Sequence, residues 1–384
     1  MSEVRVNNLS NENNTGGPTI SGITTYSGRH FFVPPSGTTA ERPEDCEPGS
    51  FRFNTDSAKL EYFRGNNIGW VEIEAEPSSD VLGGGTGSNT GLGHRGVLAG
   101  GYPGPSPGSY VDLIDFITIS TLGNSQDFGD MPANTAEMAA FGSRTRGVTV
   151  STAYSTHAQY ITFASTGYVT SFGTSTQSRS QSAGLSNSIR GIQAGGSLGY
   201  PNFVNTIDYY TIAQTGNAVD FGDLITNSRN GGGFACNQTR GIVAGGRSPD
   251  SNTNVIQFIT MSTLGNSADF GDLTSAMSRG AACANSVRWI NAGGRSPDFT
   301  NTINSLLIPT LGDAVDYGDL LQGTSFLGAA ASTTRAVWAG GYTPSNLDTI
   351  QYKEFVSAAN TIDFGDLLSG RNQVTGSSNG HGGL

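Results

Sequence analysis

The sequence is poor in charged residues, and its positive charges are few and scattered. Only 13% of the 384 residues are charged, and 31 acidic residues against 20 Lys and Arg give a formal net charge of −11. A protein surface that follows a nucleic-acid backbone needs clustered Lys and Arg, which this sequence does not contain. We therefore expect no nucleic-acid partner.

Long apolar runs and paired cysteines are missing as well. No run of 18 apolar residues occurs, so we expect no membrane span. The first residues, MSEVR, lack the apolar segment of an export signal. The three cysteines, Cys46, Cys236 and Cys283, are odd in number and far apart. They exclude a disulfide framework and are typical of small buried residues in a protein made in a reducing cytoplasm.

Stretches rich in Ala, Leu, Glu and Lys, which favour long helices, are also absent. Instead, 55 glycines and frequent Ser, Thr, Asn and Asp alternate with short runs of Val, Ile and Phe. Such a composition favours short strands joined by turns. The sequence therefore predicts an all-β fold.

An internal repeat dominates the chain after residue 94. Its first marker is Arg-Gly-apolar-x-Ala-Gly-Gly or a looser form, and it begins at Arg95, Arg146, Arg190, Arg240, Arg288 and Arg335. The gaps between successive arginines are 51, 44, 50, 48 and 47 residues, and 49 residues follow the last. The copy at Arg146 is degenerate because it lacks the diglycine.

A second marker, Asp-Phe/Tyr-Gly-Asp, follows the first in five of the repeats, at 127–130, 220–223, 269–272, 316–319 and 363–366. An alternating apolar stretch separates the two markers, and a segment of small residues follows the second. Each repeat thus predicts four short strands: one of small residues, one that ends in the diglycine, one aromatic, and one that carries Phe-Gly. The diglycine permits a turn with positive φ.

Four strands in a period of about 40 to 50 residues are typical of a β-propeller blade. Small residues suit the innermost strands, which crowd around a central channel. The diglycine that ends the second strand resembles kelch-type repeats over roughly residues 80–384. This resemblance implies a six-bladed, kelch-like β-propeller at 95–384. We expect the small-residue strand at 372–379 to complete the first repeat and close the ring.

The residues before the repeats differ in composition. Residues 1–28, rich in Asn, Ser, Thr and Gly, predict an extended N-terminal arm, and residues 77–94 predict a Gly-rich linker. Residues 29–76 hold three strand-like runs separated by turns, at 50–54, 59–63 and 70–73. We expect a small β-meander there, too small to be stable alone.

The N-terminal region carries a second resemblance. The pattern GTTAERP, GSFRFNTD, LEYFRG and GW within residues 37–70 resembles a module of structural and fibre proteins of tailed bacteriophages. With LGGGTGSNTGLGHRGVLAGGY at 82–102, it is similar to virion structural proteins of marine cyanophages. The resemblance implies a phage virion component, assembled in the host cytoplasm: a tail fibre, a neck protein or a surface appendage. Its N-terminal region would anchor it to other virion proteins.

No catalytic, metal-binding or cofactor-binding motif stands out. The four histidines lack the spacing of metal ligands. Glu137 and Glu354 are the only glutamates beyond residue 76, which argues against the carboxylate pair of a propeller glycosidase. We expect no enzyme and no cofactor. The repeated aspartates allow two interpretations, turn capping with pairing to the repeat arginines Arg190 and Arg240, or calcium binding.

The segments after the diglycine pairs vary most between repeats, and a four-stranded unit places them on one face. They carry Tyr, Arg, Asp and Asn, which stack on sugar rings and bind hydroxyls, although ordinary turns use the same polar residues. A host-surface glycan or protein is the expected partner, and homo-oligomerisation stays an open alternative. The predicted binding residues are Tyr102, Tyr110, Tyr200, Arg247, Asp250, Arg295, Asp298 and Tyr342.

Two alternatives to a receptor-binding head stay open. A passive capsid or tail decoration protein would have no host ligand, and a propeller glycosidase is the less favoured second alternative. The second repeat, 146–189, contains no Asp or Glu, and Arg146 and Arg179 are its charged residues. A surface so poor in charge is easily desolvated, so it is a candidate contact with a neighbouring virion protein. Simple divergence of one repeat explains the same composition.

Overall fold

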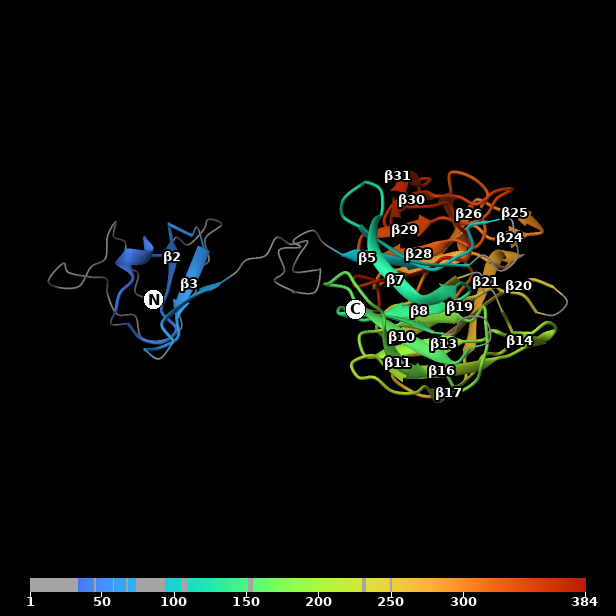
Figure 1. Cartoon of the computed structure of the whole chain (residues 1–384), viewed down its shortest axis with the longest axis horizontal. Coiled ribbons are helices and arrows are strands. Elements are labelled where there is room, and N and C mark those ends of the chain that lie inside the picture. Colours follow the sequence, from blue (N-terminus) through green and yellow to red (C-terminus); the bar gives the residue numbers. More distant parts are fainter. Residues whose placement is uncertain are drawn as a thin grey trace, which may run out of the picture. The chain divides into compact units, whose positions relative to one another are not determined.

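The computed structural model describes residues 34–44, 46–57, 59–66, 68–73, 94–104, 110–150, 155–229, 233–248 and 251–384. The chain divides into two compact units, Met1–Ala75 and Glu76–Leu384 (Figure 1). Across the described ranges the regular structure is strand, apart from one 3-10 helix, η1 (Thr39–Glu41), so the predicted all-β class is confirmed. No helix in these ranges is long and apolar enough to cross a membrane. The predicted arm at 1–28 and the predicted linker at 77–94, except for His94, lie outside the described residues.

The smaller unit contains one sheet in the order β1-β2-β3-β4. Its strands are β1 (Ser36–Gly37), β2 (Phe51–Asn54), β3 (Lys59–Phe63) and β4 (Trp70–Ile73). The three strand runs predicted for this region correspond to β2, β3 and β4. A carboxylate lies in its interior: Glu61 is fully buried, 2.6 Å from Arg42 and 3.5 Å from Arg52. Two arginines thus compensate the buried charge.

Within its described residues, the larger unit contains six antiparallel sheets of four strands, numbered here from the first marker arginine. Sheet 1 consists of β32 (Thr375–Ser378), β5 (Arg95–Ala99), β6 (Val111–Thr118) and β7 (Gln126–Thr135). Sheet 2 consists of β8 (Ala139–Gly142), β9 (Arg146–Val150), β10 (His157–Thr162) and β11 (Thr170–Thr174). Sheet 3 consists of β12 (Ala183–Ser186), β13 (Arg190–Ala194), β16 (Thr206–Thr211) and β17 (Val219–Asp223).

The remaining sheets follow the same plan. Sheet 4 consists of β18 (Gly233–Cys236), β19 (Arg240–Ala244), β20 (Thr253–Thr260) and β21 (Ala268–Met277). Sheet 5 consists of β22 (Ala281–Ala284), β23 (Arg288–Ala292), β26 (Thr302–Leu307) and β27 (Val315–Asp319). Sheet 6 consists of β28 (Gly328–Ala331), β29 (Arg335–Ala339), β30 (Thr349–Glu354) and β31 (Ile362–Asp366). Two short ribbons, β14 (Ser197–Gly199) with β15 (Asn202–Phe203) and β24 (Arg295–Ser296) with β25 (Asp298–Phe299), extend from sheets 3 and 5.

The strand order in each sheet is the predicted one: the small-residue strand first, then the marker strand, the apolar strand and the Phe-Gly or Tyr-Gly strand. In each sheet the first strand comes just before the strand with the marker arginine in the sequence. Sheet 1 has no such preceding strand in the described residues before Arg95. β32 fills that place, because Thr375–Ser378 pair antiparallel with β5. The predicted pairing of the C-terminal strand with the first repeat is therefore confirmed.

The first strands of the six sheets lie next to one another. Each contacts the first strand of the following sheet, in the order β8, β12, β18, β22, β28, β32 and back to β8. Small residues are required at these contacts. A Cβ atom added at Gly184 would collide with the backbone of Ala140, and one at Gly376 would collide with that of Ala329.

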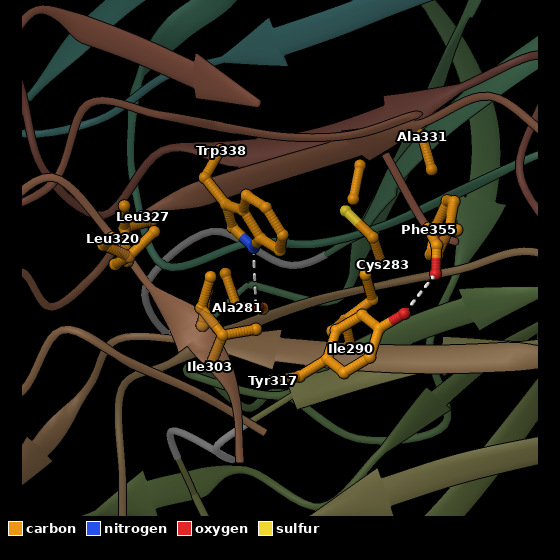
Figure 2. Packing of buried hydrophobic residues seen from close by; sticks show 12 residues of the cluster. Ala281, Cys283, Ile290, Ile303, Tyr317, Leu320, Leu327, Ala331, Trp338 and Phe355 are labelled. Carbon is orange, nitrogen blue, oxygen red and sulfur yellow. Dashed lines mark hydrogen bonds between the residues drawn. The ribbon is translucent and has the colours of Figure 1, made fainter. Parts of the chain in front are cut away.

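Among the described residues of the larger unit, the apolar core is divided into six clusters, each formed between two consecutive sheets, with one of them between sheets 6 and 1. Figure 2 shows the cluster between sheets 5 and 6. There the indole Nε1 of Trp338 donates to the carbonyl of Ala281 at 2.9 Å, and the hydroxyl of Tyr317 donates to the carbonyl of Phe355 at 2.9 Å. Both bonds satisfy polar atoms that burial would otherwise leave unpaired.

Five of the six marker arginines donate to a backbone carbonyl of the next sheet, whereas Arg288 donates to Ser305 of its own sheet. Arg190 stacks on Tyr209 and donates to the carbonyl of Met261 in the next sheet at 2.8 Å. Arg240 stacks on Phe258 and donates to the carbonyl of Ile308 at 2.9 Å. The predicted pairing of these arginines with Asp-Phe-Gly-Asp carboxylates is therefore wrong. Each guanidinium lies over its own third strand, whereas the carboxylates lie on the fourth strand and face water.

Candidate binding face and channel mouth

The residue after each diglycine pair lies opposite the segment that leads into the first strand of a sheet. These bridges join Tyr102 to Asn372, Ser197 to Ser180, Arg247 to Arg229, Arg295 to Ser278, and Tyr342 to Ser325. We name the end of the sheets formed by these ten residues and the loops that follow them the diglycine face. The turns into it have the predicted backbone: Gly195 and Gly196, for example, have φ of +61° and +118°.

Aromatic pairs lie on the diglycine face. Tyr102 and Tyr110, both half-buried, pack edge to face with ring centroids 6.1 Å apart. Tyr342 packs against Phe299 of the preceding sheet in the same way, at 5.7 Å. Tyr200 is the most exposed of the predicted tyrosines at 67%, and its ring stacks beneath a guanidinium, that of Arg229. These rings offer flat apolar surfaces toward solvent.

The predicted polar residues have different surroundings. Arg247 is half-buried, whereas Arg295 is exposed, donates from Nε to the carbonyl of Pro297 at 2.9 Å and stacks on Phe299. Asp298 is exposed, and no ion pair involves it in the described part of the chain. Asp250 lies outside the described residues, so its predicted role stays a prediction.

A second set of residues, which the sequence did not point to, surrounds the entrance to the space between the first strands. Each lies two positions before a first strand, and each has φ between +57° and +66° although none is glycine. We name this set the mouth ring: Glu137, Gln181, Arg279, Phe326 and Gln373. The mouth ring and the adjoining first-strand residues line a cavity of about 160 Å³.

Backbone hydrogen bonds connect consecutive members of the mouth ring. The N–H of Gln181 donates to the carbonyl of Glu137 at 3.1 Å, that of Phe326 to Arg279 at 2.8 Å, and that of Gln373 to Phe326 at 3.0 Å. A left-handed conformation is unfavourable for a residue with a side chain. These bonds between sheets offset that cost and hold the mouth ring in place.

A chain of polar side chains crosses the mouth between sheets 2, 3 and 4. Arg229 donates to the amide oxygen of Gln181 at 3.0 Å, and the amide nitrogen of Gln181 donates to Glu137 at 2.6 Å. Burial raises the pKa of Glu137, while the hydrogen bond from Gln181 and the charges of Arg229 and Arg279 act in the opposite direction. Glu137 is thus a half-buried carboxylate that accepts a hydrogen bond from Gln181 and lies near the positive charges of Arg229 and Arg279.

Positive charge gathers beside the mouth ring. We name Arg229, Arg247, Arg279 and Arg295 the arginine cluster. Burial lowers the pKa of Arg279, and the charges of Arg295, Arg247 and Arg229 lower it further, so each of these three arginines lies close enough to repel Arg279. The guanidinium of Arg279 stacks on the ring of Phe326 at 4.6 Å. The predicted site residues fall into two groups by sheet: Tyr102 and Tyr110 follow the diglycine of sheet 1, whereas Arg247 and Arg295 follow those of sheets 4 and 5.

A local signal for this cluster was present in the sequence. Arg229 and Arg279 each follow a serine and precede a small-residue strand. The same region holds Arg179 and Arg371, however, and these two are fully buried in ion pairs with Asp208 and Asp115. Sequence alone does not separate an arginine directed at the mouth from one directed into a sheet.

The opposite end of the space between the first strands is crossed by the C-terminal residues. The ring of His381 lies 3.0 Å from the carbonyl of Gly142 and 3.3 Å from the hydroxyl of Ser186, and Gly382 donates to the carbonyl of Ala284 at 2.8 Å. Burial lowers the pKa of His381 to about 4. A smaller cavity of about 60 Å³ lies between His381 and the first strands.

The remaining titratable groups show no catalytic or metal-binding arrangement in the described ranges. No three His, Cys, Asp or Glu side chains there come together as metal ligands. Asp127 and Asp316 each accept the N–H of the glycine two residues on at 3.0 Å, which is turn capping. All three cysteines are free, and burial raises the pKa of Cys236 and Cys283 to about 12.

The diglycine face therefore offers guanidinium groups, amides and aromatic rings around a small cavity. Such groups bind polar and anionic ligands through charge-assisted hydrogen bonds and stacking. Comparison with known proteins adds no family to this description: no family model matches the sequence, and no curated protein matches it significantly.

Proposed function

We propose that the larger unit is a six-bladed, kelch-like β-propeller and that the protein is a non-enzymatic, host-binding component of a phage virion. In this proposal the diglycine face binds a host-surface glycan or protein, and the N-terminal region anchors the chain to other virion proteins. The observation that best supports a propeller is the set of core clusters between consecutive sheets, including the cluster between sheets 6 and 1. The virion assignment is supported by the resemblance of residues 37–70 to phage structural modules.

Binding at the diglycine face is supported by what its loops expose. Irregular loops and short ribbons follow the diglycine pairs, and they present Tyr200 and Arg295 to solvent. The turns at the other end of the sheets, by contrast, repeat the sequence Thr-Leu-Gly in sheets 1, 4 and 5. Variation concentrated at one end of a repeated scaffold is typical of a recognition surface.

The placement of the two glutamates supports binding without catalysis. Glu137 lies in the mouth ring, whereas Glu354 lies at the far end of β30, 2.8 Å from Arg335, which begins β29. A glycosidase needs two carboxyl groups on either side of one bond, at most about 10 Å apart. Glu137, which precedes the first strand of sheet 2, and Glu354, at the far end of β30 in sheet 6, lie at opposite ends of different sheets and do not form such a pair.

A passive decoration protein is the alternative, and one observation favours it. Tyr168, in the turn between β10 and β11 of the charge-poor sheet 2, is 96% exposed. An aromatic ring on a surface that is easily desolvated suits a permanent contact with a neighbouring protein. The copy number and position of the chain in a virion reconstruction would separate this alternative from a receptor-binding head.

The experiment that tests the proposed function is an adsorption assay with the labelled full chain on candidate cyanobacterial host cells. We expect the wild-type chain to bind the cells, and the triple variant Tyr102→Ala, Tyr200→Ala, Tyr342→Ala to lose most of that binding. A melting temperature equal to that of the wild type would show that the variant is folded. Full adsorption by the folded variant would contradict binding at the diglycine face.

A further inference from the structure

The arginine cluster concentrates positive charge on a chain whose formal net charge is −11. Its four members come from two neighbouring sheets. Arg229 and Arg247 are cross-strand partners in sheet 4, with backbone hydrogen bonds of 3.2 and 2.9 Å between them. In sheet 5, Arg295 pairs with Ser278, the residue before Arg279. The backbone itself therefore brings the four side chains to one side of the mouth.

Two of these guanidinium groups have donors that the protein does not use. The Nε atoms of Arg247 and Arg279 are buried, and neither has a hydrogen-bond partner within the described chain. The carboxylate that acts on Arg279 is Glu137, which already accepts from Gln181. A buried, charged donor without an acceptor is unfavourable. An acceptor brought by a ligand would remove that cost.

We propose that the arginine cluster binds the anionic group, a carboxylate or a sulfate, of an acidic saccharide seated in the channel mouth. This proposal rests on the glycan-binding function proposed above and specifies its ligand. The planar fork of a guanidinium matches the two oxygens of such a group and can bind them with two parallel hydrogen bonds. An anion bound between the guanidinium groups also offsets the repulsion between their positive charges.

The surroundings of the cluster favour a sugar as the carrier of the charge. The cavity of about 160 Å³ at the mouth has the size at which a six-membered ring fits, since cavities of roughly 150 Å³ hold benzene. Phe326, beneath Arg279, offers an aromatic face at the rim. The amide groups of Gln181 and Gln373 line the same cavity, and amides hydrogen-bond hydroxyl groups.

The charge of the whole chain argues against a long polyanion such as a nucleic acid. The cluster has four arginines, whereas the surrounding molecule is acidic and would repel phosphates that extend beyond the cluster. A single anionic group on an otherwise neutral ring meets the positive patch without that repulsion. The local charge thus selects a compact anion.

Calorimetric titration of the full chain tests the proposal. The probes are an oligosaccharide that contains glucuronate, an oligosaccharide of sulfated galactose, and the neutral counterpart of each. We expect at least one acidic probe to bind about ten times more tightly than its neutral counterpart, and added salt to weaken that binding. The probe that binds identifies the anionic group. Equal binding of acidic and neutral probes, or no binding of either acidic probe, would overturn the proposal.

Variants assign the binding to the cluster. Arg279→Gln and Arg247→Gln should each weaken binding of the acidic probe about tenfold to a hundredfold, and Arg279→Lys should weaken it less because the charge remains. Arg144→Gln is the matched control. It removes one exposed arginine from the turn between β8 and β9, at the end of the sheets away from the diglycine face. An Arg144 effect as large as that of Arg279 would contradict a specific site.

Different results would contradict the host-binding function and the acidic-saccharide site. If the full chain adsorbs to host cells, and neither acidic saccharides nor Arg279→Gln reduces adsorption, the acidic ligand is wrong while the receptor-binding function stands. If acidic saccharides bind the isolated chain but no candidate host cell adsorbs it, the host-binding function is wrong while the saccharide site stands.

Discussion

At the residue scale, the six sheets fill one pair of corresponding positions, near the first strand and on the third strand, in two different ways. Two sheets bury an arginine–aspartate pair: Arg179 with Asp208 at 3.0 Å in sheet 3, and Arg371 with Asp115 at 3.1 Å in sheet 1. The other four sheets have uncharged residues at both positions. The residues at these two corresponding positions are Thr135 and Gln159, Ser228 and Gln257, Met277 and Asn304, and Thr324 and Gln351. A buried charge thus occurs where its partner is present, as desolvation requires.

This pattern predicts the effect of breaking one pair. Asp208→Asn leaves the fully buried Arg179 without its counter-charge, and we expect a loss of about 3–5 kcal/mol in the free energy of unfolding. Urea denaturation measures that loss. The chain itself suggests the rescue: Arg179→Met with Asp208→Asn gives the two positions the residue types that Met277 and Asn304 have at the corresponding positions. The double variant should be more stable than the single one, and equal stability would contradict the ion-pair explanation.

His381 predicts a dependence of stability on pH. Its pKa in the folded protein, about 4, lies below its ordinary value of 6.5, so the unfolded chain binds a proton more readily. The contribution of this group to stability is complete above pH 6.5 and is lost as the pH falls toward 4. Thermal melts of the wild type and His381→Gln between pH 7 and 4 measure it. The variant should lose less stability across that interval, and parallel curves would contradict the assignment.

At the scale of strands and turns, the sequence predicted what depends on local pattern. The strands, their order in a sheet and the diglycine turns follow from residue types that recur in most repeats. The degenerate repeat still forms β9, β10 and β11, because its apolar residues suffice to fill its place in the core. What recurs in sequence therefore recurs in structure, even where one marker is lost.

The mouth ring escaped prediction for a physical reason. Its members, such as Glu137, Phe326 and Gln373, share a position and a backbone conformation but no residue type. Hydrogen bonds between sheets stabilise that conformation, and such contacts leave no pattern along the chain. The roles of Arg190 and Arg240 were mispredicted for a similar reason, since their acceptors are backbone carbonyls of the next sheet.

Turn packing between sheets gives a prediction at this scale. Gly222 of β17 has φ of +144°, and a Cβ added there would lie 2.5 Å from the backbone of Gly265 in sheet 4. We expect Gly222→Ala to destabilise the protein by about 1–3 kcal/mol from backbone strain, with the collision in addition. Gly216→Ala, where an added Cβ meets nothing within 4 Å, is the matched control. Equal melting temperatures for the two variants would contradict this role of Gly222.

At the scale of the whole larger unit, the pairing of β32 with β5 joins residues from the two ends of the repeat region. Arg371, just before β32, donates to the carbonyl of Gly100 at 2.9 Å and pairs with Asp115. Removing β32 leaves an unpaired edge on β5, and Arg371 loses the strand that follows it and holds it beside Asp115. The repeats therefore depend on one another more than their local hydrogen bonds suggest.

Deletion of residues 372–384 tests that dependence. We expect the truncated chain to melt well below the wild type, because sheet 1 loses its first strand and the cluster between sheets 6 and 1 loses Val374. Deletion of 380–384 alone keeps β32 and should lower the melting temperature much less. An unchanged melting temperature after the longer deletion would contradict closure by β32.

The place of β32 also has a consequence for biosynthesis. Sheets 2 to 6 are each made from consecutive strands, so each can assemble as soon as its own residues have left the ribosome. Sheet 1 is complete only after β32 has been synthesised, and at about 5–20 residues per second the interval between β5 and β32 is on the order of 15 to 60 s. During that interval the edge of β5 that later pairs with β32 is open to pairing with other strands. Partners that protect nascent chains would act on this protein at that edge and in that interval.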